Sequence, residues 1–254
     1  MINVIQNFRL LTKGMNQNLH IFETPEDAAR AVAELILTAA KEKNKQSLPF
    51  NIALSGGNTP KMLFSILAHE YTDSIPWHFV RLFWVEERCV PPTHAESNFG
   101  MTYENLLKYV PIHDANIFRI LGEADPHKEA KRYQALLETQ LPLTDGVPRF
   151  DMILLGMGDD GHTASIFPGN MNLLHFESTV AVHPVGDQNR ITLTGKIINH
   201  AEKVVFLING SSKSSVLQQI IHRKQNFNDL PASHIHAHSV PADFYIDKAA
   251  AIKL

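Results

Sequence analysis

Apolar residues recur at helical spacing in one segment near the N-terminus. Between residues 25 and 40 they lie three and four positions apart, which is the spacing of a single buried helix face: Ala29, Val32, Ala33, Ile36, Leu37 and Ala40. Thr24, Pro25 and Asp27 precede this face with a capping oxygen, a first-turn proline and a carboxylate three residues after the cap. We therefore expect a helix to begin directly after Thr24.

Short apolar runs alternate with further helical patterns along the rest of the chain. The runs predict strands over residues 20–22, 51–54, 78–84, 150–155, 179–182, 190–194 and 204–208. Helices are predicted over residues 98–107, 126–137 and 211–222, and after residue 60 with Met62, Leu63, Ile66 and Leu67 facing inward. This alternation favours βαβ units, so we expect an α/β fold with a mostly parallel sheet and helices on both faces. No repeat, low-complexity tract or linker stands out, and residues 1–254 are predicted to form a single domain.

Composition narrows the class of protein. Of the 254 residues, 44% are hydrophobic and 19% charged, which is typical of a globular chain. The single cysteine, Cys89, excludes an internal disulfide and favours a reducing compartment. No apolar run approaches the ~20 residues that span a bilayer, and the first residues lack a signal-peptide pattern, so a cytoplasmic location without membrane contact is expected. No pattern of residues marks an oligomer interface, and the oligomeric state stays open.

The formal net charge of −3 argues against nucleic-acid binding, because no large positive field would collect phosphates. A small anionic ligand would instead need a local group of Arg, Lys and backbone N–H donors. Ligands in parallel sheets bind outside the carboxyl ends of the strands, so the loops that follow the predicted strands are the places to look.

The first such loop is SGGNTP, after the strand at 51–54. Gly56 and Gly57 let the backbone approach an anion closely before the next helix begins. Three side chains add donors: Ser55, Asn58 and Thr59. The equally weighted alternative is a plain turn in which Asn58 or Thr59 caps the helix. The loop lacks the pattern of a nucleotide P-loop.

Three cationic residues follow other predicted strands. Arg88 ends the charged triplet Glu86-Glu87-Arg88, which by itself is typical of a solvated loop, although its forked guanidinium suits a phosphate. Arg190 opens the strand at 190–194. Lys213 lies after the strand at 204–208, where the start of a helix favours anions, although a solvated lysine there is common.

The loop GMGDDGHTAS at residues 156–165 matches G-x-G-x-x-G, the dinucleotide fingerprint, but we exclude that function. Asp159 and Asp160 would put negative charge where a pyrophosphate should bind, and Glu177 precedes the next strand instead of ending it. The loop places His162 two residues after Asp160. A histidine is the usual general base for activating water, and a carboxylate beside it can fix its tautomer. The alternative is a capping or surface histidine, one of 14 in the chain.

His234, His236 and His238 alternate, and on a strand they would face one side, an arrangement that suits a metal site. We interpret them as a surface strip of histidines and predict no metal.

Together these loops resemble the 6-phosphogluconolactonase family. The matching segments occur in the family's order from about residue 19 onward: NIALSGGNTP at 51–60, WVEERCVPPTHAESNFGM at 84–101, DMILLGMGDDGHTASIFPG at 151–169 and RITLTGKIINHAEKVVFLINGSSKSSVL at 190–217. The third is specific, whereas the first is shared with relatives such as glucosamine-6-phosphate deaminase. Met15 lies just before the region of resemblance, so residues 1–14 are a candidate extension with its own role or a misread start.

The resemblance implies a Rossmann-like sheet, a phosphorylated sugar lactone as substrate and no cofactor. The expected reaction is hydrolysis of 6-phospho-D-glucono-1,5-lactone to 6-phosphogluconate in the pentose phosphate pathway. We expect His162 to activate water, with Asp160 beside it. The substrate's phosphate and sugar would be held by Ser55, Gly56, Gly57, Asn58, Thr59, Arg88, Arg190 and Lys213.

Two departures from related patterns leave alternatives open. The family usually has Asp-Glu-Arg where this chain has Glu86-Glu87-Arg88, and an extra methylene moves a carboxylate that must be positioned accurately. The deaminases resemble GHIAFNEP in the histidine loop, whereas this chain reads GHTASIFP, with Phe167 in place of the glutamate. The alternatives are a glucosamine-6-phosphate deaminase or isomerase, and a sugar-phosphate sensor without catalysis.

Overall fold

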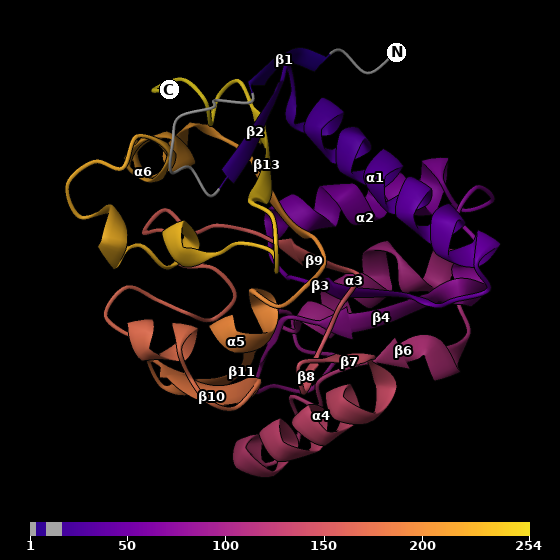
Figure 1. Ribbon diagram of the computed structural model, residues 1–254. Coiled ribbons are helices and arrows are strands. Elements are labelled where there is room, and N and C mark those ends of the chain that lie inside the picture. The colour runs from indigo at the N-terminus through magenta and orange to yellow at the C-terminus, as the bar shows by residue number, and fades with distance from the viewer. Residues whose placement is uncertain (1–3, 9–16) are drawn as a thin grey trace.

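A computed structural model describes residues 4–8 and 17–254 and shows an α/β fold around one central sheet (Figure 1). In spatial order its eight strands are β1 (Val4–Phe8), β2 (Gln17–Phe22), β13 (Ala242–Asp247), β12 (Val204–Ile208), β9 (Met152–Leu155), β3 (Phe50–Leu54), β4 (Val80–Trp84) and β6 (Ile117–Phe118). Neighbouring strands run parallel except for β1, which pairs antiparallel with β2. The predicted mostly parallel sheet is confirmed.

The α-helices connect these strands. They are α1 (Pro25–Lys45), α2 (Asn58–Glu70), α3 (Asn98–Asn105), α4 (Pro126–Gln140), α5 (Gly195–Ile198) and α6 (Ser214–Ile221). From β2 to β6 the chain moves toward one edge of the sheet, and from β6 to β13 it moves back. Because crossovers between parallel strands are right-handed, the two directions put their helices on opposite faces. Figure 1 shows α1 and α2 on one side of the strands and α5 and α6 on the other.

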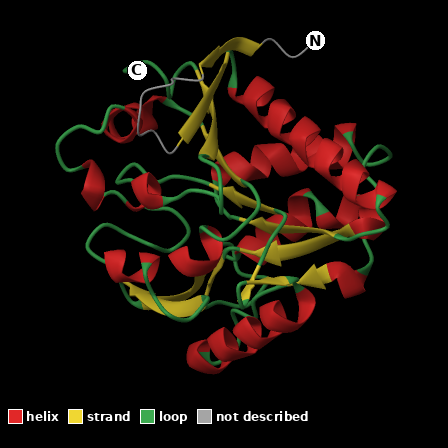
Figure 2. Cartoon of the chain, viewed as in Figure 1, coloured by secondary structure: helices red, strands yellow, loops and turns green. Residues whose placement is uncertain are grey.

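Short 3₁₀ turns fill several connections between these elements (Figure 2). They span Trp77–Phe79, Leu107–Tyr109, Asp114–Asn116, Met171–Leu174, Ser211–Lys213, Phe227–Asp229 and Pro231–His234. The first of them shortens the strand predicted at 78–84, which begins only at Val80, and the fifth precedes α6 in the helix predicted at 211–222.

The start of α1 shows why the sequence folds as predicted. The Thr24 side chain accepts a hydrogen bond from the backbone N–H of Asp27 at 3.1 Å, which satisfies one donor of the first turn. The predicted inward face is buried except for Leu37, which is partly buried. It packs on a core of strand residues, and each fully buried Val, Leu, Ile or Phe side chain stabilises the fold by ~1.5–3 kcal/mol.

A second, antiparallel sheet lies beside the first and consists of β10 (Val180–Val185), β11 (Gln188–Leu193) and β5 (Glu86–Arg88). The interpretation of Glu86–Arg88 as a loop was therefore wrong. One residue, Val85, separates β4 in the central sheet from β5 in the small one. Its N–H donates to Leu54 at 2.9 Å, and its carbonyl accepts from Leu193 at 2.7 Å. A two-stranded hairpin, β7 (Leu143–Thr144) and β8 (Val147–Pro148), completes the sheets.

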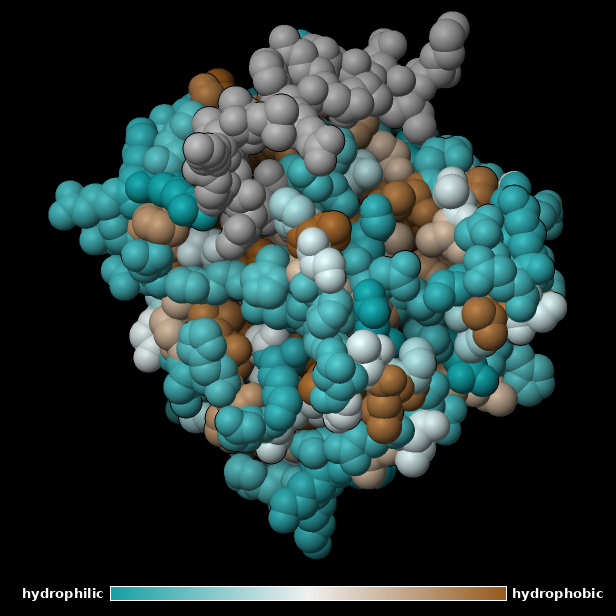
Figure 3. Space-filling view, viewed as in Figure 1, coloured by the Kyte–Doolittle hydropathy of each residue, from teal (hydrophilic) through white to brown (hydrophobic). Residues whose placement is uncertain are grey.

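Part of the candidate extension at residues 1–14 belongs to the fold, since residues 4–8 form β1. The remaining residues of that segment, and Met15, lie outside the described residues. No helix in the described part of the chain is long and apolar enough to cross a membrane. The face seen in Figure 3 is mainly hydrophilic, with apolar side chains in small separate patches.

Candidate active site

A cavity of about 410 Å³ opens at the carboxyl ends of β3, β9 and β12, where the topology predicts a ligand site. Loops after these three strands and the two strands β5 and β11 of the small sheet form its wall. The lining residues are Ser55, Gly56, Gly57, Asn58, Thr59, Pro60, Glu86, Arg88, Gly156, Met157, Gly158, His162, Thr163, Ala164, Arg190, Asn209, Ser212 and Lys213. They include every predicted site residue except Asp160.

The loop after β3 depends on its two glycines. Gly57 has φ +103°, a conformation that other residues rarely adopt, and it is the N-cap of α2. No side chain caps this helix, so the alternative in which Asn58 or Thr59 caps it is wrong. At Gly56 an added Cβ would lie 1.7 Å from Oδ1 of Asn98. The N–H groups that begin α2 therefore stand at the cavity without a side-chain acceptor, which favours an anion.

The loop after β9 places His162 against Asp160. Nδ1 of the ring lies 2.6 Å from Oδ1 of Asp160, and the same oxygen accepts the backbone N–H of His162 at 3.0 Å. Burial acts to raise the pKa of Asp160, but these bonds from His162 outweigh it and leave that pKa lowered. An ionised carboxylate can only accept, so Nδ1 must carry the hydrogen and Nε2 the lone pair. The pair therefore has the arrangement of a general base and the acid that orients it.

A glycine also permits this pairing. A Cβ on Gly158 would lie 2.1 Å from Nδ1 of His162 and 2.5 Å from Oδ1 of Asp160. The Gly158 N–H donates to the His162 carbonyl at 2.9 Å, which closes the loop. The glycines of the G-x-G-x-x-G pattern here form a tight turn that lets His162 pack against Asp160, and do not bind a dinucleotide.

The cations come from the small sheet and from the loop after β12. Arg88 and Arg190 are partners in the β5–β11 register. Burial, together with the charge of Arg88, lowers the pKa of Arg190. Lys213 forms an ion pair with Asp159, and this pairing lowers the pKa of Asp159. An anionic ligand would relieve the repulsion between the two guanidinium groups.

Three buried polar atoms of the cavity wall lack a protein partner: Ser55 Oγ, Arg88 Nε and Asn209 Oδ1. Only seven such atoms occur among the described residues. Because buried polar groups are nearly always hydrogen-bonded, this concentration marks a place for a ligand or water. Sequence reasoning missed Asn209, although it directly follows β12 and the strand-end rule points to it.

The two acidic residues of β5 have different roles. Glu86 lines the cavity, and one of its oxygens accepts from Ser165 Oγ at 2.7 Å. Glu87 is buried beneath α3 and accepts from the N–H groups of Asn98 and Phe99 at 2.7 and 2.8 Å. Burial raises the pKa of Glu87, with these bonds opposing the shift. Glu87 therefore holds the start of α3, and Glu86 is the acid that faces a ligand.

The sequence model of the family described as Glucosamine-6-phosphate isomerases/6-phosphogluconolactonase matches residues 23–243. The chain belongs to this family.

Relatives in the family cover most of the chain. The 6-phosphogluconolactonase of Treponema pallidum (strain Nichols) is 41% identical over 203 residues, which are 79% of this chain and 83% of the relative. That of Aggregatibacter actinomycetemcomitans is 37% identical over 236 residues, 92% of this chain and 98% of the relative. The crystal structure of devB protein, at 37% identity, has a TM-score of 0.87 and covers 94% of this chain and 99% of that one.

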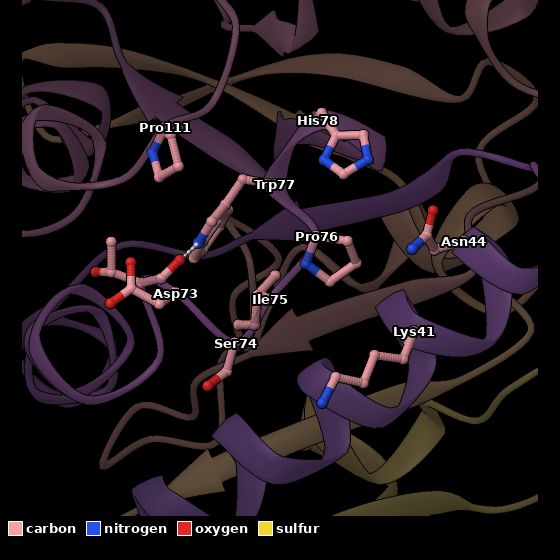
Figure 4. A pocket seen from close by; sticks show the side chains of 10 residues that line it. Lys41, Asn44, Asp73, Ser74, Ile75, Pro76, Trp77, His78 and Pro111 are labelled. Carbon is pink, nitrogen blue, oxygen red and sulfur yellow. Dashed lines mark hydrogen bonds between the residues drawn. The ribbon is translucent and has the colours of Figure 1, made fainter.

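One of the other cavities, of about 480 Å³, lies at the amino ends of β3 and β4, opposite the candidate site (Figure 4). Lys41 and Asn44 of α1 and the segment 72–78 before β4 line it. The Trp77 indole N–H donates to the Thr72 carbonyl at 3.0 Å. No predicted site residue lies there.

The histidine strip is not on a strand. His234 ends the 3₁₀ turn Pro231–His234, and its Nε2 lies 2.7 Å from the Asn228 carbonyl. His236 Nδ1 lies 2.8 Å from the Ala237 carbonyl, and the ring of His238 meets that of His200 edge-on. The strand on which the three histidines would have shared one face does not form, because Pro231 begins a 3₁₀ turn. His234 and His236 are partly buried and His238 is exposed. Within the described residues no group of three potential metal ligands occurs.

Proposed function

We propose that the chain hydrolyses 6-phospho-D-glucono-1,5-lactone to 6-phosphogluconate, the lactone-opening step of the pentose phosphate pathway. The observation that carries the proposal is the imidazole of His162, hydrogen-bonded to the Asp160 carboxylate on the wall of a cationic cavity. The names of the Treponema and Aggregatibacter relatives support it. The chain is thus a carboxylic ester hydrolase of carbohydrate metabolism.

His162 acts on a water molecule through Nε2. As the water oxygen bonds to the lactone carbonyl carbon, Nε2 takes the proton, and the tetrahedral intermediate forms. When the bond from that carbon to the ring oxygen breaks, the imidazolium returns the proton to the ring oxygen. Asp160 keeps Nδ1 protonated throughout and stabilises the imidazolium.

The cations hold the phosphate and orient the sugar. Three cations, Arg88, Arg190 and Lys213, line the cavity, whereas its lining includes one carboxylate, Glu86. Arg88 and Arg190 present forked donors, which suit phosphate oxygens. The loop Ser55–Thr59 adds backbone and hydroxyl donors, with Gly56 and Gly57 allowing close approach. Asn209 offers an unbonded Oδ1 for a sugar hydroxyl.

Neither alternative gains support from the site. A deaminase that resembles GHIAFNEP pairs its histidine with a glutamate, and here Phe167 stacks on His162 instead. A sensor without catalysis has no use for the bonded His162–Asp160 pair. We place the reaction in the cytoplasm, where Cys89 would stay reduced. Burial raises the pKa of its thiol to about 11, so it stays protonated.

The test is acid release from freshly generated lactone, with and without the purified protein. His162→Ala should lower kcat by ~10²–10⁴-fold, the usual cost of losing a general base. His78→Ala is the matched control, since this exposed histidine lines the opposite cavity.

An unchanged rate in His162→Ala would refute the assignment of the base. Phosphorylated sugar bound by the wild type without any acceleration would refute hydrolysis and favour the sensor.

A further inference from the structure

The ring of Phe167 contacts both working parts of the proposed site. It stacks on the His162 imidazole with ring centroids 4.4 Å apart and an interplanar angle of 26°. The guanidinium carbon of Arg190 lies 5.6 Å from the same ring's centroid, which is cation–π range. One side chain therefore touches the base and a cation of the anion subsite, although His162 lies in the loop after β9 and Arg190 on β11 of the small sheet.

The imidazole needs this second support. Its bond to Asp160 fixes Nδ1, but a single hydrogen bond leaves the ring free to tilt about that contact. His162 is only partly buried, at 32% side-chain exposure, so packing alone does not hold it. A ring stacked against its face restricts the tilt and so sets the direction in which Nε2 points.

The chemistry of the side chain matters as much as its shape. Phenyl neither donates nor accepts a conventional hydrogen bond, so it supports the imidazole without competing for the Nε2 lone pair. A carboxylate in this place would attract Arg190 away from an anionic ligand and would favour the protonated imidazole, which cannot act as a base. Phe167 also lies near His183, with centroids 5.7 Å apart, which limits its own movement.

We propose that Phe167 is a positioning residue that sets the His162 imidazole and the Arg190 guanidinium for lactone hydrolysis. This inference rests on the proposed function, because it assumes that His162 is the base. It predicts a mainly catalytic loss when the aromatic face is removed, and a smaller loss in substrate binding.

The kinetic test compares Phe167→Leu, Phe167→Tyr and the wild type. Phe167→Leu keeps an apolar side chain but loses the stack, and should lower kcat about 10-fold with KM changed about 3-fold or less. Phe167→Tyr keeps the ring and should restore kcat to within about 2-fold of wild type. Phe176→Leu is the matched control, because Phe176 is exposed and lines a separate surface hollow.

A spectroscopic readout tests the stack independently of activity. In the wild type the Cε1–H proton resonance of His162, assigned by its loss in His162→Ala, should be shielded by the phenyl ring. It should move downfield in Phe167→Leu and stay in place in Phe176→Leu.

The outcomes separate the two ideas. If the wild type does not accelerate lactone hydrolysis, the proposed function fails, whatever the resonance shows. If the wild type is active and Phe167→Leu keeps its kcat, or loses kcat without any rescue in Phe167→Tyr, the positioning role is overturned. A KM effect with unchanged kcat would also overturn it.

Discussion

Two of the protein's cavities are similar in size and lie at opposite ends of the strands of the central sheet, and only one of the two has the features of a ligand site. The cavity at the carboxyl ends of the strands, about 410 Å³, holds two arginines side by side and three buried polar atoms without partners. The cavity at the amino ends, about 480 Å³, is lined by residues such as Trp77 whose polar atom is bonded within the protein. None of the unpartnered buried atoms in the described chain lies there. Volume therefore does not identify the site, whereas unsatisfied polarity does.

Removing Asp160, the acid that orients His162, should produce the largest difference in kcat between substitutions in the two cavities. Asp160→Ala should lower kcat about 100-fold, because the imidazole loses its fixed tautomer. The loss should be smaller than the ~10⁴-fold cost of altering the buried triad aspartate of serine proteases, since Asp160 is half exposed. Asp73→Ala, at the amino edge, should leave kcat unchanged. Steady-state kinetics of both variants would check this, and a change confined to KM would contradict it.

A methyl group added to the loop after β3 should lower the stability of the fold. Gly56→Ala drives Cβ into the Asn98 side chain, so the free energy of unfolding should fall by about 2 kcal/mol, within the usual range for overpacking. Gly156→Ala is the control, because its Cβ would meet nothing within 4 Å. Chemical denaturation measures both. Equal stability of the two variants would show that the loop yields freely.

The binding cation should have a moderate effect. Lys213→Ala should raise KM about 10-fold with less change in kcat, because a charge-assisted contact to the phosphate is worth ~1.5 kcal/mol. Asp159 already neutralises part of the Lys213 charge, which keeps the effect small. Lys41→Ala in the amino-edge cavity should not change KM. If Lys41→Ala raised KM more than Lys213→Ala, the anion would bind in the cavity at the amino ends of the strands, and the proposed site would be contradicted.

Asp243, near the amino end of β13, stabilises the fold, and its substitution has the smallest predicted effect. Burial tends to raise the pKa of Asp243, but bonds from His20 and Asn18 and the charge of Lys203 lower it. A lowered carboxyl pKa stabilises the folded state above the ordinary value of ~3.9, and that contribution disappears as pH falls through the folded-state pKa. Asp243→Asn should therefore lower the free energy of unfolding by about 1 kcal/mol at pH 7.

The same measurement near pH 3 should show a smaller difference between Asp243→Asn and the wild type. A difference that grows on acidification would mean that the folded-state pKa is raised and not lowered.

The main α/β pattern could be predicted from the sequence because it depends on local signals. The Thr24 cap and the apolar runs of β3 and β12 are readable without any partner. The strand at Glu86–Arg88 is not, because three charged residues have a loop's composition and become a strand only by pairing with β11. β13 was also missed, although its residues alternate between buried and partly buried positions in the first five places.

The site shows the same division. The rule that ligands bind after the strands brought the three loops together correctly. It did not reveal that Arg190 faces Arg88, because that contact depends on the pairing of β5 with β11. Nor did it reveal that Phe167 stacks on His162, because that contact depends on the turn between Thr163 and Ile166. The bond from Ser165 to Glu86 likewise joins residues 79 positions apart.

Val85, between β4 and β5, determines how firmly the small sheet is attached to the central sheet. This one residue is hydrogen-bonded to both sheets, through its N–H to β3 and through its carbonyl to β11, so the strand that carries Arg88 leaves the central sheet without a flexible linker. The small sheet is therefore held rigidly against the central sheet at this junction and does not rotate about a hinge. The arginines are therefore held in place before a substrate arrives, and little conformational entropy remains to be lost when it binds.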